Sequence, residues 1–135
     1  MKHCLVKLRV RKELAVDIVM FVLVVLLIPS IMMGFGYRWT NKPPGKINWI
    51  YGYRSKRSMK NQDTWDFAHR YVGRVWLKWG MGAGFASLIL WMLFPYGEPM
   101  ISIIMYGQLF CLLFPVILTE SALKKTFTKD GQRKS

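Results

Sequence analysis

Three long apolar runs, separated by polar and basic stretches, set the pattern of this chain. The runs begin at Leu14, Val75 and Met100. Each has about 20 residues, the length that an α-helix needs to cross the hydrocarbon core of a bilayer. A soluble domain of this size rarely concentrates its apolar residues in this way. The pattern predicts one all-α domain over residues 1–135, an integral membrane protein with three transmembrane helices at about residues 14–36, 75–94 and 100–119.

A basic leader, residues 2–12, precedes the first run and gives it the appearance of a signal peptide. The apolar part is too long for a signal peptide, however, and no small-residue cleavage pattern follows it. We therefore expect an uncleaved transmembrane helix. Pro29 lies inside this helix and removes one backbone donor, so we expect the helix to bend or loosen there.

A polar segment, residues 38–74, separates the first two predicted helices and is expected to be a structured basic loop. Its residues 41–45 read Asn-Lys-Pro-Pro-Gly, which is turn chemistry that blocks a helix. Asn61 then has the side chain of a helix N-cap, and Asp63 complements the positive end of a helix. We expect a loop over residues 38–58 and a helix from about Asn61 to about Phe94.

Prolines punctuate the C-terminal part of the chain. Residues 95–99 read Pro-Tyr-Gly-Glu-Pro and predict a tight hairpin between the second and third helices. Pro115 is expected to interrupt the third helix near its end. The charged tail, residues 124–135, is expected to fray.

Small residues form one face of the second predicted helix, at Gly80, Gly84 and Ser87. In a membrane, small residues let helix backbones approach closely, and dispersion then favours the contact. Two partners fit this face: another helix of the same chain, or a second copy of the chain. Oligomerisation through the glycine face therefore stays open.

The chain is 53% hydrophobic and yet carries a formal net charge of +13. The two values are compatible because apolar and basic residues occupy different segments. We expect the basic segments to meet anionic lipid headgroups. Nucleic acid is not an expected partner, because no nucleic-acid-binding motif surrounds the charge.

Lysine and arginine are distributed unevenly along the chain. The leader has five, residues 38–78 have ten, the predicted hairpin has none and the tail has five, which together make the total of 20. With three spans, the loop and the tail share one side of the membrane, and the positive-inside rule places that side in the cytoplasm. The basic leader argues for the reverse orientation, because it resists translocation. We expect a cytoplasmic loop and C-terminus.

Nothing in the sequence has the pattern of a catalytic or metal site. His69 lies three residues after Asp66, so the two could hydrogen-bond on a helix surface, but no serine in an elbow-like motif accompanies them. No Cys-x-x-Cys or His-x-x-x-His spacing indicates a metal, and no glycine-rich pattern indicates a nucleotide. We expect no enzymatic activity, no catalytic residue, no metal and no cofactor.

The segment 46–76 is polar, basic and rich in aromatic residues, a composition that a mere connector does not need. At fixed spacing it contains Asn48, Gly52, Tyr53, Arg54, Ser55, Ser58, Asn61, Trp65, Ala68, Arg70 and Gly73. This pattern resembles the signature of the SdpI/YfhL family of bacterial membrane proteins. The apolar runs on either side also fit the family.

The resemblance implies a multi-pass protein of the bacterial cytoplasmic membrane. It also implies a function, because the family includes an immunity protein that protects its producer from a secreted, membrane-active toxin peptide. The family's further role of sequestering a repressor is not expected here, since this chain is similar to a short form without additional N-terminal spans. No catalytic role accompanies the resemblance.

The motif is expected to bind a ligand. Tyr53 and Arg54 place an aromatic face beside donors that can hold a carboxylate or a phosphate. Alternatively, Arg54 caps carbonyl groups or pairs with Asp63 or Asp66, and so fastens the loop onto the second helix. The candidate binding residues are Asn48, Gly52, Tyr53, Arg54, Ser55, Ser58, Asn61, Trp65, His69 and Arg70.

The expected function is therefore that of a membrane immunity or resistance protein that binds a toxin peptide without transforming it. Two alternatives stay open. One is an accessory or scaffold subunit of a larger membrane complex, docked through the glycine face. The other is a protein that binds anionic lipid. The expected partners are membrane lipids and either a toxin peptide or a partner membrane protein.

Overall fold

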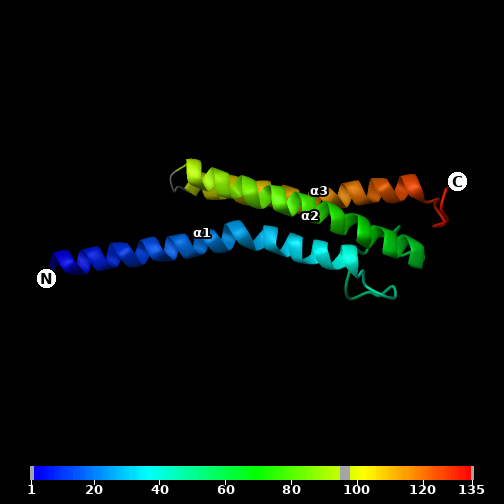
Figure 1. Ribbon diagram of the computed structural model, residues 1–135, viewed down its shortest axis with the longest axis horizontal. Helices are drawn as coiled ribbons and strands as arrows, with labels where there is room; N and C mark the ends of the chain where they lie inside the picture. Colours follow the sequence, from blue (N-terminus) through cyan, green and yellow to red (C-terminus); the bar gives the residue numbers. More distant parts are fainter. Residues whose placement is uncertain (1, 95–97, 135) are drawn as a thin grey trace.

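The described residues form three long helices (Figure 1). The computed structural model describes residues 2–94 and 98–134, with the backbone alone for residues 2–5, Leu8, Met20, Phe21, Val24 and Glu98. The helices are α1 (Lys2–Asn41), α2 (Gln62–Leu93) and α3 (Glu98–Thr126). The described residues form no strand, only an isolated bridge between Phe127 and Arg133. The predicted all-α class is confirmed, whereas residues 95–97 of the predicted hairpin lie outside the described residues.

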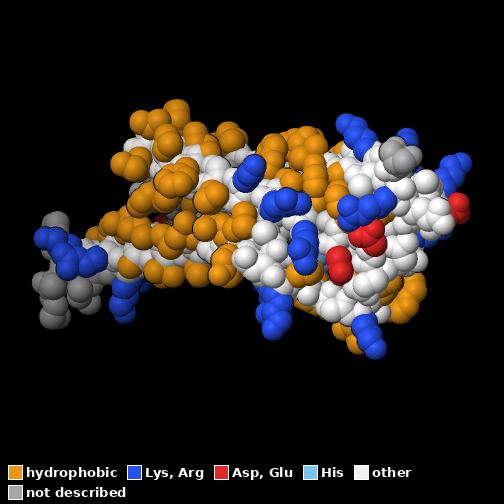
Figure 2. Space-filling model, turned by 45° about the vertical axis from the view of Figure 1, so that its right-hand side comes forward, with side chains coloured by type: hydrophobic (Ala, Val, Ile, Leu, Met, Phe, Trp, Pro, Cys, Tyr) orange, Lys and Arg blue, Asp and Glu red, His pale blue; other side chains and the backbone are white. Residues whose placement is uncertain are grey.

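The helices run side by side in an elongated bundle (Figure 1). The C-terminal end of α1, the start of α2 and the end of α3 lie at one end of this bundle, and the N-terminal part of α1 extends beyond the other end. Among the described residues, α2 and α3 are long and apolar enough to cross a membrane. Figure 2 shows hydrophobic side chains over the bundle, and charged ones gathered at the end that carries the C-terminus and at the tip of α1.

Helix α1 is longer than predicted at both ends, because the basic leader is helical and the helix continues to Asn41. The loop predicted from Arg38 therefore begins later. Side chains stabilise the last turn of α1. The Thr40 hydroxyl donates to the Gly36 carbonyl at 2.7 Å, and the Asn41 side-chain amide donates to the Tyr37 carbonyl at 2.8 Å. These bonds occupy carbonyl groups at a helix end, and the prolines that follow stop the helix.

Helix α3 continues through Pro115 to Thr126, so the predicted interruption at Pro115 is wrong. Inside a bundle, neighbouring side chains can satisfy the backbone groups that a proline disturbs. On either side of the proline, the Trp76 indole of α2 donates to the Leu112 carbonyl at 3.3 Å, and the Thr119 hydroxyl donates to the Pro115 carbonyl at 2.7 Å, so side chains support the helix there. Beyond this point Leu123 is buried in the core and favours the extra turns.

The C-terminal tail folds back onto the start of α2, and the prediction that it frays is wrong. Phe127 is buried and meets the Phe67 ring edge-on, with ring centroids 5.3 Å apart. The Gly131 carbonyl accepts from the Asn61 amide at 2.8 Å. Arg133 holds both carboxylate oxygens of Asp63 at 2.8 Å. A buried ring and a bidentate ion pair thus order a segment that its composition alone would leave loose.

Two glycines bring α1 and α2 into backbone contact. A Cβ atom on Gly36 would lie 2.9 Å from the Gly73 carbonyl oxygen, and a Cβ atom on Gly73 would lie 2.9 Å from the Gly36 carbonyl oxygen. Such reciprocal approach leaves no room for a methyl group on either helix. At the end of the bundle that carries the motif, α1 and α2 are therefore held together by direct backbone packing.

The predicted glycine face lies inside the bundle. Gly80 packs against Met32, and a Cβ atom on Gly84 would lie 3.6 Å from Pro29 of α1. The Ser87 hydroxyl accepts a hydrogen bond at 2.9 Å from Gln108 of α3. In the single chain this face is thus occupied by the intramolecular partner that the sequence left open.

We expect Gly73→Ala to destabilise the protein, since overpacking a tight contact costs about 1–3 kcal/mol. Thermal unfolding in mild detergent should show a lower midpoint for this variant. Gly82→Ala is the matched control, because a Cβ atom on Gly82, also in α2, meets nothing within 4 Å. Equal midpoints for the two variants would contradict the described contact.

Candidate functional site

His69 is the hub of the motif region. It is fully buried on α2. Its Nε2 atom accepts a hydrogen bond from the Tyr53 amide at 2.7 Å, and its Nδ1 atom lies 2.7 Å from the Trp65 carbonyl. An amide can only donate and a carbonyl can only accept, so the ring is neutral with its proton on Nδ1. His69 therefore joins the loop to α2, and Asp66, the partner considered from the sequence, accepts from Gln62 instead.

Gly52 lets the loop reach His69. Its φ is +121°, which strongly favours glycine, and a Cβ atom there would clash with the His69 ring and lie 3.1 Å from the Trp65 ring. Trp65 is itself fully buried and donates from its indole to the Pro44 carbonyl at 3.0 Å. The loop backbone at Gly52 thus packs directly against the His69 and Trp65 rings of α2.

Tyr53 ties the same loop to α3. Its ring is buried, and its hydroxyl donates to the Glu120 carboxylate at 2.9 Å. Burial, together with this bond to Glu120, raises the pKa of the Tyr53 phenol well above its usual value. The phenol therefore stays a hydrogen-bond donor at physiological pH, and it anchors the loop rather than presenting an open aromatic face.

Short-range hydrogen bonds fix the rest of the loop. Ser55 and Ser58 each donate a backbone amide to the other's hydroxyl, at 2.8 and 3.1 Å. The Asn48 side chain accepts from the Tyr51 amide at 2.8 Å. Asn61 caps α2 in a capping box with Thr64, as predicted. Most candidate binding residues thus build the loop.

Trp39, which the sequence analysis missed, completes the support beneath the loop. Its indole donates to the Tyr51 hydroxyl at 2.7 Å and stacks on Trp76, with ring centroids 5.1 Å apart. It also meets the His69 ring edge-on. Trp39 lies four residues after Phe35, so the two rings share one face of a helix. This spacing indicates a role for Trp39 only if the helix continues past residue 36, where the sequence analysis ended it.

Among the candidate binding residues, Arg54 is exposed at the surface of the loop and can contact a ligand there. It is exposed and donates to the Trp49 carbonyl, so it caps a carbonyl group as one alternative proposed. Arg54 pairs with neither Asp63 nor Asp66. Asp63 binds Arg133, and Asp66 accepts a hydrogen bond from Gln62. Arg70 is also exposed, but it does not line the groove described next.

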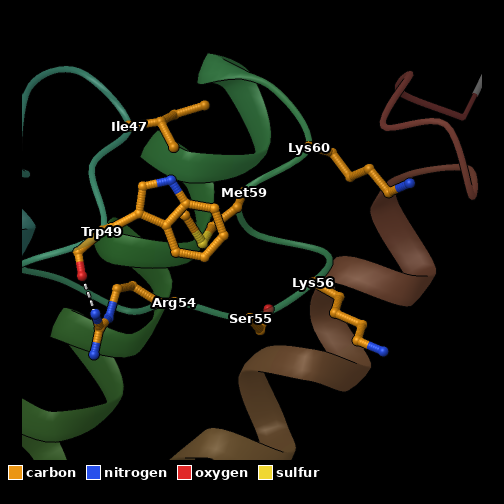
Figure 3. A pocket seen from close by; sticks show the side chains of 7 residues that line it. All are labelled: Ile47, Trp49, Arg54, Ser55, Lys56, Met59 and Lys60. Carbon is orange, nitrogen blue, oxygen red and sulfur yellow. Dashed lines mark hydrogen bonds between the residues drawn. The ribbon is translucent and has the colours of Figure 1, made fainter.

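A groove of about 790 Å³ opens along the loop beside Arg54 (Figure 3). We call it the basic groove, and its lining residues are Ile47, Trp49, Arg54, Ser55, Lys56, Met59 and Lys60. Figure 3 shows the Trp49 ring over Met59, with Arg54 to one side and the two lysine chains on the far side. Residues 42–60 include no Asp or Glu, so these cations lack acidic partners within the loop.

The basic groove can bind an anion that has an apolar part. The Trp49 side chain is 78% exposed and offers a large flat surface, while Arg54 can hold a carboxylate or phosphate through its free N–H donors. Among the described residues, no group of three His, Cys, Asp or Glu side chains could hold a metal ion. The exposed Trp49 ring and the free Arg54 donors suit the groove to recognition.

We expect Gly52→Ala to detach the loop from His69. A left-handed conformation costs a residue with a side chain about 1–3 kcal/mol, to which the clash adds. Hydrogen exchange of the Tyr53 amide should accelerate by about tenfold or more in this variant. Gly45→Ala is the control, because a Cβ atom there meets nothing within 4 Å. Unchanged protection in Gly52→Ala would show that the contact does not hold the loop.

Comparison with known proteins identifies the family of this chain. The family model of the SdpI/YfhL protein family matches residues 45–119, which include the loop, α2 and most of α3. The chain is 30% identical over 92 residues to the uncharacterized protein YfhL of Bacillus subtilis (strain 168), which covers 67% of this chain and 78% of YfhL. No solved structure matches. With two helices able to span a bilayer, these matches indicate a membrane protein, and the chain belongs to the SdpI/YfhL family.

Proposed function

We propose that this protein confers resistance to a membrane-active peptide by binding it in the basic groove. The observation that carries the proposal is a rigid loop whose cations have no acidic partner within the loop and whose Trp49 ring is left uncovered. A toxin that enters membranes is amphipathic, and the groove offers a surface for both of its parts. The binding is expected to involve no chemical transformation.

Rigidity favours this role because a preformed site loses little conformational entropy when it binds. The groove backbone is held by Asn48, by the Ser55 and Ser58 pair and, through Tyr53, by His69. None of these bonds needs to break for Arg54 or Trp49 to meet a ligand. Family membership supports the proposal, because resistance to a membrane-active peptide is the function that the resemblance implies.

The proposal includes three membrane spans, with residues 14–36 of α1 as the third. Val19, Leu23, Leu27 and Ile31 are all exposed on one stripe of α1. Such a stripe is costly in water and favourable in lipid. The loop and the tail lie at one end of the bundle, so fifteen of the 20 Lys and Arg residues fall on one side, which we propose is cytoplasmic.

Arg54→Ala should reduce resistance without reducing the amount of protein in the membrane. A hydrogen bond to a charged group contributes about 1.5–3 kcal/mol, so we expect peptide binding to weaken by about tenfold or more. The measurement is survival of cells that express each variant during peptide challenge, together with membrane abundance. Lys129→Ala is the matched control, because it removes one exposed cation of the tail outside the groove.

The role of the groove is excluded if Arg54→Ala cells with normal protein abundance survive as well as wild-type cells. Trp49→Ala provides a second variant, since it removes the apolar surface and leaves every cation in place. Loss of resistance in the Lys129→Ala control as well would assign the effect to net charge rather than to the groove.

Cysteine labelling tests the proposed topology. Single cysteines at Lys56 and Lys129, in a chain whose own cysteines are replaced, should react with an impermeant thiol reagent only after the cells are opened. A cysteine at Lys7 should react in intact cells. Labelling of all three positions from the same side of the membrane would show that α1 does not span it. The reverse labelling pattern would show the opposite orientation.

The same cations, which have no acidic partner within the loop, favour a second candidate function, the binding of anionic lipid. The surface of an anionic leaflet attracts basic segments by about 1 kcal/mol per cation. In this case Arg54→Ala would reduce the retention of phosphatidylglycerol by the purified protein, while peptide resistance stayed unchanged. The two readouts therefore separate the candidates.

A further inference from the structure

A second cleft, of about 350 Å³, opens where the loop meets all three helices. This volume lies at the lower end of the range of about 300–1,000 Å³ for small-ligand pockets. Its lining residues are Trp39, Gly52, Tyr53, Arg54, Ser55, Trp76, Val116 and Glu120. The cleft shares Arg54 and Ser55 with the basic groove, but it alone contains a carboxylate.

Glu120 lies where the apolar run of α3 ends, so the proposed three-span arrangement places its carboxylate at the depth of lipid headgroups. Its side chain is 34% exposed. One carboxylate oxygen accepts from Tyr53, while the other has only the Arg57 guanidinium at 3.9 Å, too far for a hydrogen bond. This oxygen is therefore an open acceptor for a cationic donor.

The half-buried Trp76 provides a second feature that suits a cation. Trp39 and Trp76 both line the cleft, but Trp39 is buried and stacks on Trp76, so Trp76 is the indole that a ligand can reach. A cation is attracted to the face of a tryptophan when it lies within about 6 Å of the ring centroid. The carboxylate and the Trp76 indole therefore favour the same kind of ligand group.

Arg54 supplies the opposite charge in the same cleft. One of its N–H groups donates to Trp49, and the others are free to hold an oxyanion. Val116 contributes an apolar wall from the membrane-facing part of α3. A ligand that fits has a cation, an oxyanion and an apolar part that continues into the bilayer.

We propose that this cleft binds the phosphoethanolamine headgroup of an aminophospholipid. The ammonium group donates to Glu120 beside the Trp76 indole, and the phosphate accepts from Arg54. A primary ammonium has N–H donors for the open oxygen, which a quaternary ammonium lacks. A phosphatidylglycerol headgroup has no cation for Glu120. Glu120 and Arg54 together thus select a zwitterionic headgroup with a primary amine.

Native mass spectrometry of the purified protein in mild detergent tests this assignment. The probes are phosphatidylethanolamine, phosphatidylcholine, phosphatidylglycerol and N-acetylated phosphatidylethanolamine, offered at equal concentration. We expect phosphatidylethanolamine to be retained about tenfold more than the others. Glu120→Gln should lose this preference, because it removes the charge yet keeps an acceptor for Tyr53, whereas Lys129→Ala should behave as the wild type.

Equal retention of the acetylated and free-amine lipids by the wild-type protein would overturn the assignment, even if Glu120→Gln fails to fold. So would a folded Glu120→Gln variant that keeps the preference. Equal retention of all four lipids by the wild-type protein would also overturn it. No toxin is present in this experiment, so its result is independent of the survival assay that tests resistance.

Discussion

The contact between His69 and the Tyr53 amide is the one on which the rest of the motif depends. A buried ring with one donor and one acceptor nitrogen bridges the helix carbonyl of Trp65 and the loop amide. The loop must approach that ring closely, and Gly52 makes this possible with a positive φ and no side chain. Removing the approach would leave a buried ring nitrogen and a loop amide unpaired, a costly state for both.

This constraint explains why the motif joins residues of two kinds. Some side chains form hydrogen bonds to the backbone of the loop itself, as Asn48, Ser58 and Trp65 do. Arg54 needs only the Trp49 carbonyl to hold its position and keeps most of its donors for the surface. The polar residues that the sequence marks as a ligand site are largely the means of building a rigid one.

The sequence predicts local features better than those that depend on distant contacts. The helical class and the Asn61 cap follow from periodicity and from a single side chain, and the structure confirms both. The ordered tail does not follow, because its pairing of Arg133 with Asp63 joins residues 70 positions apart. The role of His69 was also hidden: the sequence offered Asp66 as its neighbour, whereas its partner is a backbone amide on a separate loop.

The close packing of α1 on α2 explains how a small protein can fix such a loop. Gly36 and Gly73 meet backbone to backbone one turn before Trp39, which supports both Tyr51 and His69. Were these helices farther apart, Trp39 would lose its stacking on Trp76, and the loop would lose the support of Trp39. In lipid, helices gain little from the hydrophobic effect against each other, and closely fitted backbones associate through dispersion instead. The precision of the surface site thus originates in two residues that have no side chain.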